Sequence, residues 1–389
     1  MRDVVIIEAV RSPIGKREGK LSGTLPVHLA AHILRELLAR AHVEPAHLQD
    51  VIVGCVTPLG DQGANIARLA VLQAGFPEQL PAVTINRMCG SSQQAIHFAA
   101  QEILSGDMDV VIAGGIEMMS RVPLGSDWPT QWPPDFPYPL VHQGMSAEMM
   151  AEKWHISREE LDRFSFESHV RAAAATRRGD FAREIVPTLV TLTDGKSETM
   201  ASETMTSETM TIDEGIRFEP NLDKMGKLQP AFKPVGFVTA ANSSQISDGA
   251  AAVLLMSADK AKELGLRPRA RVVARVVVGS DPVLMLSGPI PATRQALDRA
   301  GLELDDIDAI EINEAFASVV LAWQKEIQPD PARVNPNGGA IALGHPLGAT
   351  GAILMTKLLH HLERTSGRYG LQTMCIGHGM ATATIIERM

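Results

Sequence analysis

The chain carries a weak internal repeat, which constrains its fold more than any other feature of the sequence. Val43–Ile52 resembles Leu302–Ile310. Each stretch follows an amphipathic helical pattern, around residues 29–41 and 292–300, and each leads into a strand-like run. Strands that alternate with helices favour a parallel or mixed sheet with helices on both faces. The repeat therefore predicts two α/β halves.

The two halves continue along similar lines. Each offers a strand, a special turn and a helix, and later a strand followed by glycines. The strand, turn and helix are expected at Val83–Leu104 in the first half and at Arg333–Leu362 in the second. The later strand followed by glycines is expected at Val110–Gly115 and at Leu371–Gly379. Packing the halves together would place equivalent strand ends side by side. We therefore expect the reactive side chains at these ends to meet.

Residues 118–245, between the halves, have a different texture. This stretch is irregular and rich in Pro, as in Pro133–Pro139, and a helix is expected at Arg158–Arg178. Residues 197–211 contain a five-residue tandem repeat of Ser-Glu-Thr-Met with a spacer. Because five is neither a helix nor a strand period, we interpret the repeat as an inserted surface loop or hairpin tip. A Met-rich contact surface is the less favoured alternative.

Composition excludes several classes of protein. With 389 residues and 45% hydrophobic content the chain can bury a large core, and its net charge of −9 without a basic block argues against nucleic acid as a partner. Three cysteines, an odd number, argue against a disulfide framework and for a reducing compartment. We see neither a signal peptide nor a membrane span. A soluble cytoplasmic enzyme is the expectation.

Cys89 is the first candidate catalytic residue. It ends the strand-like run that begins at Val83, and the Gly-Ser-Ser after it opens a helical stretch, Gln93–Leu104. A thiol at such a junction lies over free backbone N–H groups and the positive end of the helix dipole, and both favour the thiolate. A lone cysteine is more often a small buried hydrophobe. Here, candidate partners far along the chain favour a nucleophile.

Three candidate partners lie near the C-terminus. His345 stands between Gly and Pro in the glycine-rich run Asn337–Gly351, where it could accept a thiol proton or simply make one turn hydrogen bond. Cys375 follows the strand-like Gly370–Met374, and it is either an acid/base toward carbon or a structural thiol. Gly377 could aim its N–H into the same cavity as an oxyanion donor.

The third partner, Asn313, follows the strand-like Asp308–Ile312. It could cap the helix expected at Phe316–Lys325, hold a water molecule or orient a histidine, and taken alone the cap is the better interpretation. The remaining cysteine, Cys55, lies in a buried-strand pattern and is interpreted as core.

At these residues the chain resembles the thiolases, a family of acyl-CoA C-acyltransferases. The four catalytic loops of that family match Cys89-Gly90-Ser91, Asn313-Glu314-Ala315-Phe316, Gly344-His345-Pro346 and Cys375-Ile376-Gly377, in order and over nearly the whole chain. The resemblance implies an α/β thiolase-like fold, in which two duplicated βαβαβαββ halves form α/β/α/β/α layers with an inserted loop domain. It divides the chain into residues 1–117 plus about 246–267, a loop domain at 118–245 that covers CoA, and residues 268–389.

The resemblance also implies roles for individual residues. Cys89, His345, Cys375 and Asn313 would be catalytic, and Gly377 would serve an oxyanion hole. The family pattern suggests CoA contacts for His142, Arg217, Phe232 and Ser244, and places Phe316 and Gln143 in the substrate pocket. No metal and no cofactor is implied, because CoA is itself a substrate.

Three of these positions raise their own alternatives. Ser244 lies on a polar turn that we expect to lead into a helix, so a plain helix entry capped by Ser247 or Asp248 competes with a CoA contact. Gln143 departs from the methionine that short-chain biosynthetic members often carry. His378 departs from a glycine, and it could equally line the pocket or point away and cap a turn.

The implied reaction is thiolytic cleavage of a 3-ketoacyl-CoA to acetyl-CoA and a shortened acyl-CoA, with ping-pong kinetics through an acyl-Cys89. We favour a degradative enzyme for medium or longer acyl chains, because Arg11–Arg17, Gln143 and Ser287-Gly288-Pro289 look like degradative members, some of which cleave sterol side chains. The alternatives are a biosynthetic acetoacetyl-CoA thiolase, a ketoacyl synthase and a non-catalytic lipid-binding member. The family implies a homodimer or homotetramer.

Overall fold

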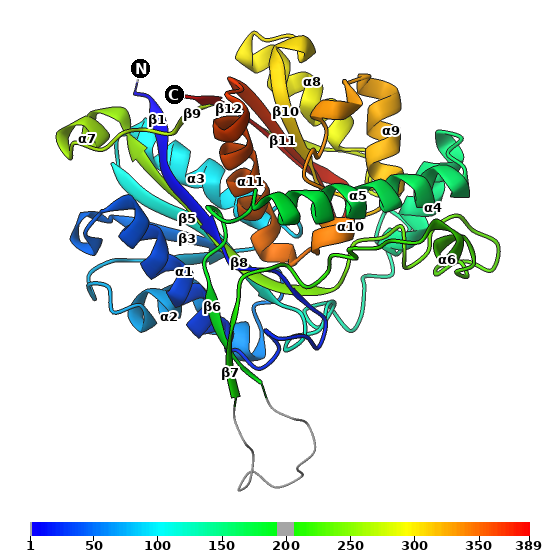
Figure 1. Cartoon of the computed structure of the whole chain (residues 1–389), viewed down its shortest axis with the longest axis horizontal. Coiled ribbons are helices and arrows are strands. Elements are labelled where there is room, and N and C mark those ends of the chain that lie inside the picture. Colours follow the sequence, from blue (N-terminus) through cyan, green and yellow to red (C-terminus); the bar gives the residue numbers. More distant parts are fainter. Residues whose placement is uncertain (1, 193–205) are drawn as a thin grey trace, which may run out of the picture.

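A computed structural model describes residues 2–192 and 206–389, and a large mixed sheet runs through its centre (Figure 1). Within these residues the sheet has ten strands in the order β10-β11-β12-β9-β1-β8-β5-β3-β4, with β2 paired to β8. A separate two-stranded hairpin, β6–β7, projects from the body. The mixed α/β class predicted from the repeat is confirmed.

The first half supplies the strands β1 (Val4–Arg11), β2 (Gly15–Lys16), β3 (Asp50–Gly54), β4 (Val83–Ile85), β5 (Val110–Met118) and β8 (Ser247–Ser257). Its helices are α1 (Pro26–Ala41), α2 (Ile66–Gln73), α3 (Ser91–Ser105) and α7 (Ala258–Glu263). The second half supplies β9 (Ala270–Gly279), β10 (Ile307–Ile312), β11 (Tyr369–Ile376), β12 (Met380–Arg388), α8 (Pro289–Ala300), α9 (Ala317–Ile327), α10 (Ala340–Leu343) and α11 (Thr350–Thr365). Between them lie α4 (Gln143–Lys153), α5 (Arg158–Arg178), β6 (Thr188–Leu192), β7 (Thr206–Met210) and α6 (Leu222–Gly226).

The sheet order confirms that the chain is built from two similar halves. Reading outward from the β1–β9 junction, the first half runs β1-β8-β5-β3-β4 and the second runs β9-β12-β11-β10, followed by a parallel bridge from Ile310 to Val334. In both halves the inner pairs are antiparallel and the outer pairs are parallel. Only two residue pairs join β1 to β9.

Helices α3 and α11 form a middle layer between the two halves of the sheet. Helix α3 packs on β3 and β5, α11 packs on β10 and β11, and the two helices pack against each other. Their approach is close, because a Cβ at Gly351 would collide with the backbone of Gln93, and Ala352 N–H donates to Ser92 Oγ at 2.9 Å. Helices α1 and α2 cover one outer face, and α8 and α9 cover the other.

Two expectations about local structure need correction. The segment after Ser244 is not a helix but β8, an entirely buried strand between β1 and β5. Its Ala-rich run has helical propensity, but burial on both faces overrides propensity in a central strand. Cys375 does not follow β11 but lies inside it, one residue before its end. The helix expected at Arg158–Arg178 is α5 with those bounds, opened by a Ser157–Glu160 capping box.

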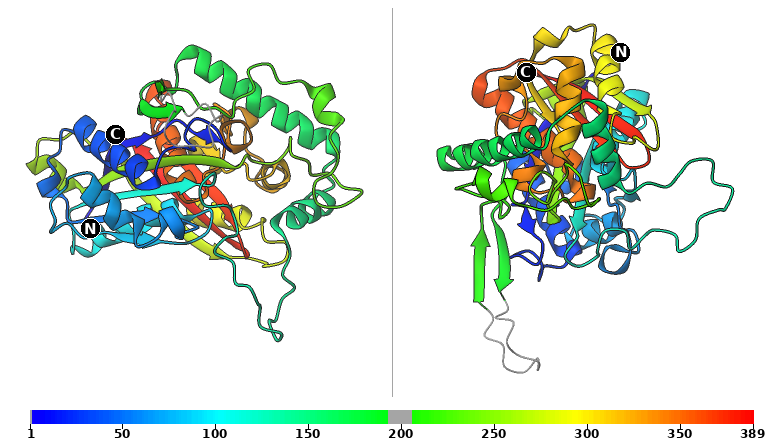
Figure 2. Two further views of the ribbon diagram at one scale, coloured as in Figure 1. Left: turned by 90° about the horizontal axis from the view of Figure 1, so that it is seen from below. Right: turned by 90° about the vertical axis from the view of Figure 1, so that its right-hand side faces the viewer.

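The inserted region contains two extended segments. Residues 119–142 form a long irregular loop that stands away from the body in both views of Figure 2. The third copy of the five-residue repeat, residues 207–210, lies in strand β7 (Thr206–Met210) of the hairpin β6–β7 rather than in a loop. The copies that begin at Ser197 and Ser202 fall outside the described residues. No helix within the described ranges is long and apolar enough to cross a membrane.

Candidate active site

The candidate catalytic residues gather at the carboxyl ends of parallel strands, as expected for an α/β sheet. Cys89 follows β4, Asn313 follows β10 directly, and Cys375 lies at the end of β11. His345 lies between α10 and the short 3₁₀ turn Leu347–Ala349 that precedes α11. Each residue therefore lies close to the end of a strand or helix.

A cavity of about 390 Å³ opens at this point of the molecule. Cys89, His345 and Gly377 line this cavity, although Cys89 and His345 are each at most 5% exposed. Asn313 and Cys375 are fully buried and do not line it. The other predicted residues that line the cavity are His142, Gln143, Phe232, Ser244 and Phe316.

The thiol of Cys89 is held on a constrained turn. Met88, just before it, has a positive φ of 46°, which is rare for a residue with a side chain, and Asn86 Oδ1 accepts from Met88 N–H at 2.7 Å. Burial raises the pKa of Cys89 to about 11, and N–H donors from Gly377, Gln143 and Cys89 itself lower it in part. Backbone N–H groups thus favour the thiolate, as expected from the sequence, but burial of the thiol outweighs them.

The hydrogen bonds of His345 define its tautomer. Thr350 Oγ1 donates its only proton to the Pro346 carbonyl at 2.8 Å, so it must accept from His345 Nδ1–H, which lies 2.6 Å away. The lone pair of the neutral ring is then on Nε2, where the Asn313 amide donates at 3.3 Å. Burial lowers the pKa of His345 to about 4, so the ring is a neutral base at physiological pH.

Asn313 orients the histidine and is not a helix cap. Helix α9 begins four residues later and has Phe316 as its cap residue, which excludes the cap interpretation. Within the described residues, Asn313 Oδ1 has no hydrogen-bond partner although it is buried. Asn335 holds the backbone next to Asn313 in place, because its side chain accepts from Ile312 N–H and donates to Ile312 O, both at 2.9 Å.

Cys375 is the more strongly protonated thiol. Burial raises its pKa above the usual range for cysteine, and a charge on Cys89 raises it further. Only its own backbone N–H opposes this shift to any extent. The site thus contains two thiols in different protonation environments, close enough for a charge on one to raise the pKa of the other.

The position of His378 decides between the two alternatives for this residue, a place in the pocket lining or a turn cap that points away. Its side chain lines the cavity, with ring centroids 6.3 Å from Trp128 and 6.1 Å from Trp132. On another wall, His142 lies 5.1 Å from Phe232, and Phe232 lies 6.0 Å from Phe316. The cavity is therefore bounded by aromatic rings on both sides.

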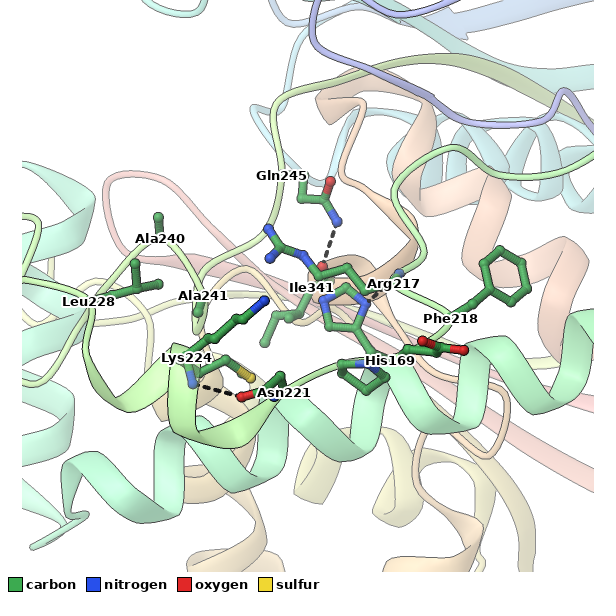
Figure 3. Close-up of a pocket in the computed structure, with 13 residues that line it drawn as sticks. His169, Arg217, Phe218, Asn221, Lys224, Leu228, Ala240, Ala241, Gln245 and Ile341 are labelled. Atoms are coloured by element: carbon green, nitrogen blue, oxygen red, sulfur yellow. Dashed lines mark hydrogen bonds between the residues drawn. The ribbon is translucent and has the colours of Figure 1, made fainter.

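Arg217 lies apart from the other predicted residues, in a neighbouring pocket of about 340 Å³ (Figure 3). Gln245 borders both spaces, and its amide donates to Gly215 O at 3.0 Å and to Ile341 O at 2.9 Å. Lys224 reaches into the same pocket as Arg217. The pocket thus carries two cationic side chains and one acidic one, Glu219, and shares Gln245 with the cavity that Cys89 lines; no sequence motif had singled out Lys224.

Glu117 holds several segments around the site together, and it was not among the residues predicted from the sequence. It is fully buried and accepts from Val56 N–H at 2.8 Å, Gln62 Nε2 at 2.9 Å and, across the halves, Gly348 N–H at 2.9 Å. A carboxylate inside an apolar strand such as β5 is the signal that could have found it, since buried charges are rare unless they are fully hydrogen-bonded.

Comparison with known proteins accounts for this arrangement. The thiolase N-terminal domain matches residues 4–259 and the thiolase C-terminal domain matches residues 266–388. The chain is 52% identical to the steroid 3-ketoacyl-CoA thiolase FadA6 of Mycobacterium tuberculosis, over all of this chain and 95% of that one. It is 45% identical to a 3-ketoacyl-CoA thiolase of Salmonella typhimurium over the full length of both.

The overall fold also matches that of a known structure. A crystal structure of the Bacillus anthracis acetyl-CoA acetyltransferase superposes with a TM-score of 0.90 at 39% identity, and the match covers 100% of this chain and 99% of the other. The order of strands, the four loops at their carboxyl ends and these matches lead to one conclusion: the chain belongs to the thiolase family.

Proposed function

We propose that the protein cleaves 3-ketoacyl-CoA thioesters with CoA, releasing acetyl-CoA and a shortened acyl-CoA. The observation that carries this proposal is that the Cys89 thiol and a neutral His345, whose Nε2 bears the ring's lone pair, line one cavity, with a second thiol, Cys375, close enough for a charge on Cys89 to raise its pKa. Acyl transfer through cysteine needs a nucleophile and a base, and cleavage of a carbon–carbon bond needs a separate acid for carbon.

The first half-reaction uses these groups in order. His345 Nε2 takes the Cys89 proton as the sulfur attacks the 3-keto carbon. The same Nε2–H then donates to the oxyanion, together with a water molecule that Asn313 positions. Collapse breaks the C2–C3 bond and leaves the acyl group on Cys89 and an enolate of acetyl-CoA. The N–H groups of Cys89 and Gly377 hold the enolate oxygen while Cys375 protonates C2.

The second half-reaction returns the enzyme to its starting state. CoA enters, Cys375 takes its thiol proton, and the CoA sulfur displaces Cys89 from the acyl group. The leaving Cys89 sulfur takes back the proton that His345 Nε2 has held since the first half-reaction. Two thiols with different protonation environments suit these roles, because one must leave as a thiolate and the other must carry a proton to carbon. The expected kinetics are ping-pong.

We assign the CoA path to the predicted residues on either side of Gln245. Ser244, His142 and Phe232 line the cavity near Cys89 and suit the apolar, amide-bearing pantetheine. Arg217 and Lys224 line the neighbouring pocket and suit the phosphates at the other end of CoA. Reversing the charge at Arg217 should raise the KM for CoA and leave the alkylation of Cys89 unchanged.

The acyl group is proposed to be large and apolar. Leu124, Trp128 and His378 line the cavity, and Trp132 and Phe136 continue the aromatic surface outward with ring centroids 5.7 Å apart. Trp128 and Phe136 are 44% and 42% exposed, which is more apolar exposure than a two-carbon acyl group could cover. The name of the steroid-specific relative supports an acyl group that bears rings.

The main rival is a biosynthetic acetoacetyl-CoA thiolase, which would run the same machinery in reverse on two acetyl-CoA molecules. The relatives named for 3-ketoacyl-CoA are 52% and 45% identical, against 39% for the acetyl-CoA acetyltransferase, which favours degradation. A ketoacyl synthase would decarboxylate its donor and would have no use for the second thiol, Cys375.

The deciding experiment mixes the purified protein with CoA and 3-ketoacyl-CoAs of rising chain length, including one with a ring-bearing acyl group. Acetyl-CoA release is followed beside Cys89→Ala. We expect release that Cys89→Ala abolishes and that is fastest with the larger substrates. Activity confined to acetoacetyl-CoA would favour the biosynthetic rival. Turnover of malonyl donors without acetyl-CoA release would favour the synthase.

A Trp128→Ala variant tests the aromatic surface separately. It should raise the KM for long or ring-bearing substrates and leave acetoacetyl-CoA turnover unchanged, whereas an equal effect on both would remove the acyl role of this surface. We further propose a homodimer or homotetramer in a reducing cytoplasm. All three cysteines are unpaired, which agrees with such a compartment.

A further inference from the structure

We propose that the side-chain amide of Gln143 is a catalytic hydrogen-bond donor to the Cys89 sulfur, acting with the backbone N–H groups of Gly377 and Cys89 to stabilise the thiolate that forms and leaves during acyl transfer. The proposal rests on the thiolase function stated above, and it adds a group that the expected role of Gln143 as a pocket-lining residue did not contain.

The position of the amide is the first support. Gln143, Cys89 and Gly377 line the same cavity. A Cβ built on Gly377 would lie 3.2 Å from Gln143 Nε2, so the amide nitrogen lies directly against the turn that follows Cys375. Hydrogen bonding to the thiol from Gly377 N–H, the Gln143 amide and Cys89 N–H provides the largest contributions that lower the pKa of Cys89.

The surroundings of the thiol explain why a side-chain donor matters. Cys89 lies in a cluster of apolar residues with Val56, Met119, Leu347, Met374 and Ile376. Among the described residues that line the cavity there is no Lys or Arg. A thiolate in such a place depends on fixed N–H dipoles, and of the three main donors only Gln143 can be removed by substitution.

The helix that carries Gln143 is held firmly at its start. Gln143 is the first residue of α4, and the preceding His142 caps this helix by accepting from Gly144 N–H at 3.1 Å. The ring of Phe232 packs on Gly144 so closely that a Cβ there would collide with it. Ser146 Oγ adds a bond to Val283 O at 2.8 Å. The amide is thus presented from a fixed backbone, which is what preorganised stabilisation requires.

The other titratable groups that act on Cys89 are accounted for. Glu117, on β5, raises its pKa by charge repulsion, and the buried Cys375, on β11, is coupled to it. His345 is neutral. His142 and His378 line the wider cavity. Before the proton moves, His345 Nε2 is an acceptor, so the ring does not compete with the amide as a donor to the sulfur.

The test measures alkylation of Cys89 by iodoacetamide between about pH 6.5 and about pH 10, with the modified site identified by peptide mass. The wild type is compared with Gln143→Met, which matches the length of the side chain without its donor, and with the isosteric Gln143→Glu. Lys153→Gln, an exposed position at the far end of α4, is the control. Alkylation needs no substrate, so it can succeed even if the proposed thiolysis reaction is wrong.

Loss of the donor should move the alkylation profile to higher pH, because the thiolate is less stable without it. At a fixed pH below the thiol pKa, Gln143→Met should react about three- to tenfold more slowly, since a one-unit rise in pKa lowers the thiolate fraction tenfold and the higher nucleophilicity offsets part of this. Gln143→Glu should be at least as slow, because a carboxylate cannot donate and repels the thiolate. Lys153→Gln should match the wild type.

Turnover gives the second measurement. If Gln143 stabilises the thiolate, kcat of Gln143→Met falls and the KM for acyl-CoA stays within about twofold. Unchanged alkylation profiles in both Gln143 variants would overturn the proposal. A raised KM with an unchanged profile would also overturn it, and would leave Gln143 as a residue that only shapes the pocket. If one variant does not fold, the other decides.

Discussion

The two halves share one scaffold but differ in what they place at their strand ends. In the first half the end of β3, Gly54, pairs with Gly115 of β5, and in the second half the end of β10, Ile312, pairs with Thr373 of β11. Counting onward from these pairs, Cys55 corresponds to Asn313, and Glu117 corresponds to Cys375. The equivalents of two proposed catalytic residues are therefore a core cysteine and a structural carboxylate.

This difference shows how a symmetrical fold provides an asymmetrical site. The first half contributes the proposed nucleophile and a carboxylate that holds loops in place, and the second half contributes the proposed base and acid and the Asn313 amide. Glu117 accepts from the Gly348 N–H, so the structural residue of one half fixes the loop that carries the base of the other. Four substitutions test this division of labour.

The largest effect is expected for Cys375→Ala. This change removes the proposed acid for carbon, so kcat for thiolysis should fall by about 10²- to 10⁴-fold. Unfolding should change little, because the thiol makes no hydrogen bond on which the strand depends. Acetyl-CoA release and thermal melting are the measurements. Wild-type turnover in the variant would show that this strand end has no chemical role.

Glu117→Ala, at the equivalent position of the first half, should act mainly on stability. Its removal leaves several buried N–H groups without an acceptor, including those of Val56 and Gly348, at a cost of about 3 kcal/mol or more. Urea unfolding would measure this loss, with Glu117→Gln as an intermediate control that retains one carbonyl oxygen. A variant as stable as the wild type would contradict the structural role.

Thr350→Val tests how the second half holds its base. Valine has the same shape but cannot accept from His345 Nδ1–H, so the ring loses the bond that fixes its tautomer. We expect about a tenfold fall in kcat with little change in KM, and recovery in Thr350→Ser. Nitrogen NMR of the histidine would report the tautomer directly, and an unchanged tautomer in the valine variant would refute the assignment.

Cys55→Ala should have the smallest effect. Cys55 is fully buried in the core and lies where the second half has Asn313. Removing its sulfur should cost about 1 kcal/mol and leave kcat unchanged, whereas Asn313→Ala should lower kcat. Chemical denaturation and steady-state assays on both variants make the comparison. A loss of turnover in Cys55→Ala would place this residue in the site.

The sequence predicted the strand ends well because reactive residues there follow strong local signals. Asn313 comes directly after the apolar run of β10, as expected, whereas Cys89 lies four residues beyond the end of β4, on a turn before α3 and not at the end of the strand. The helix expected after Ser244 was wrong, because the pairing of β8 with β1 and β5 is a long-range contact that local propensity does not report. Thr350 could not be found at all, since its role depends on a hydrogen bond to a ring fixed only in the folded chain.

The contact between α3 and α11 has a consequence for motion. Cys89, the proposed nucleophile, precedes α3, and His345, the proposed base, precedes α11. The two helices meet where Gly351 lies against the backbone of Gln93 and Ala352 N–H donates to Ser92 Oγ. Moving the Cys89 sulfur away from the His345 ring would require separating α3 from α11, which are closely packed in the middle layer of the core. We therefore expect the two proposed reacting groups to keep their separation, and an opening that admits a substrate to involve segments outside this pair of helices.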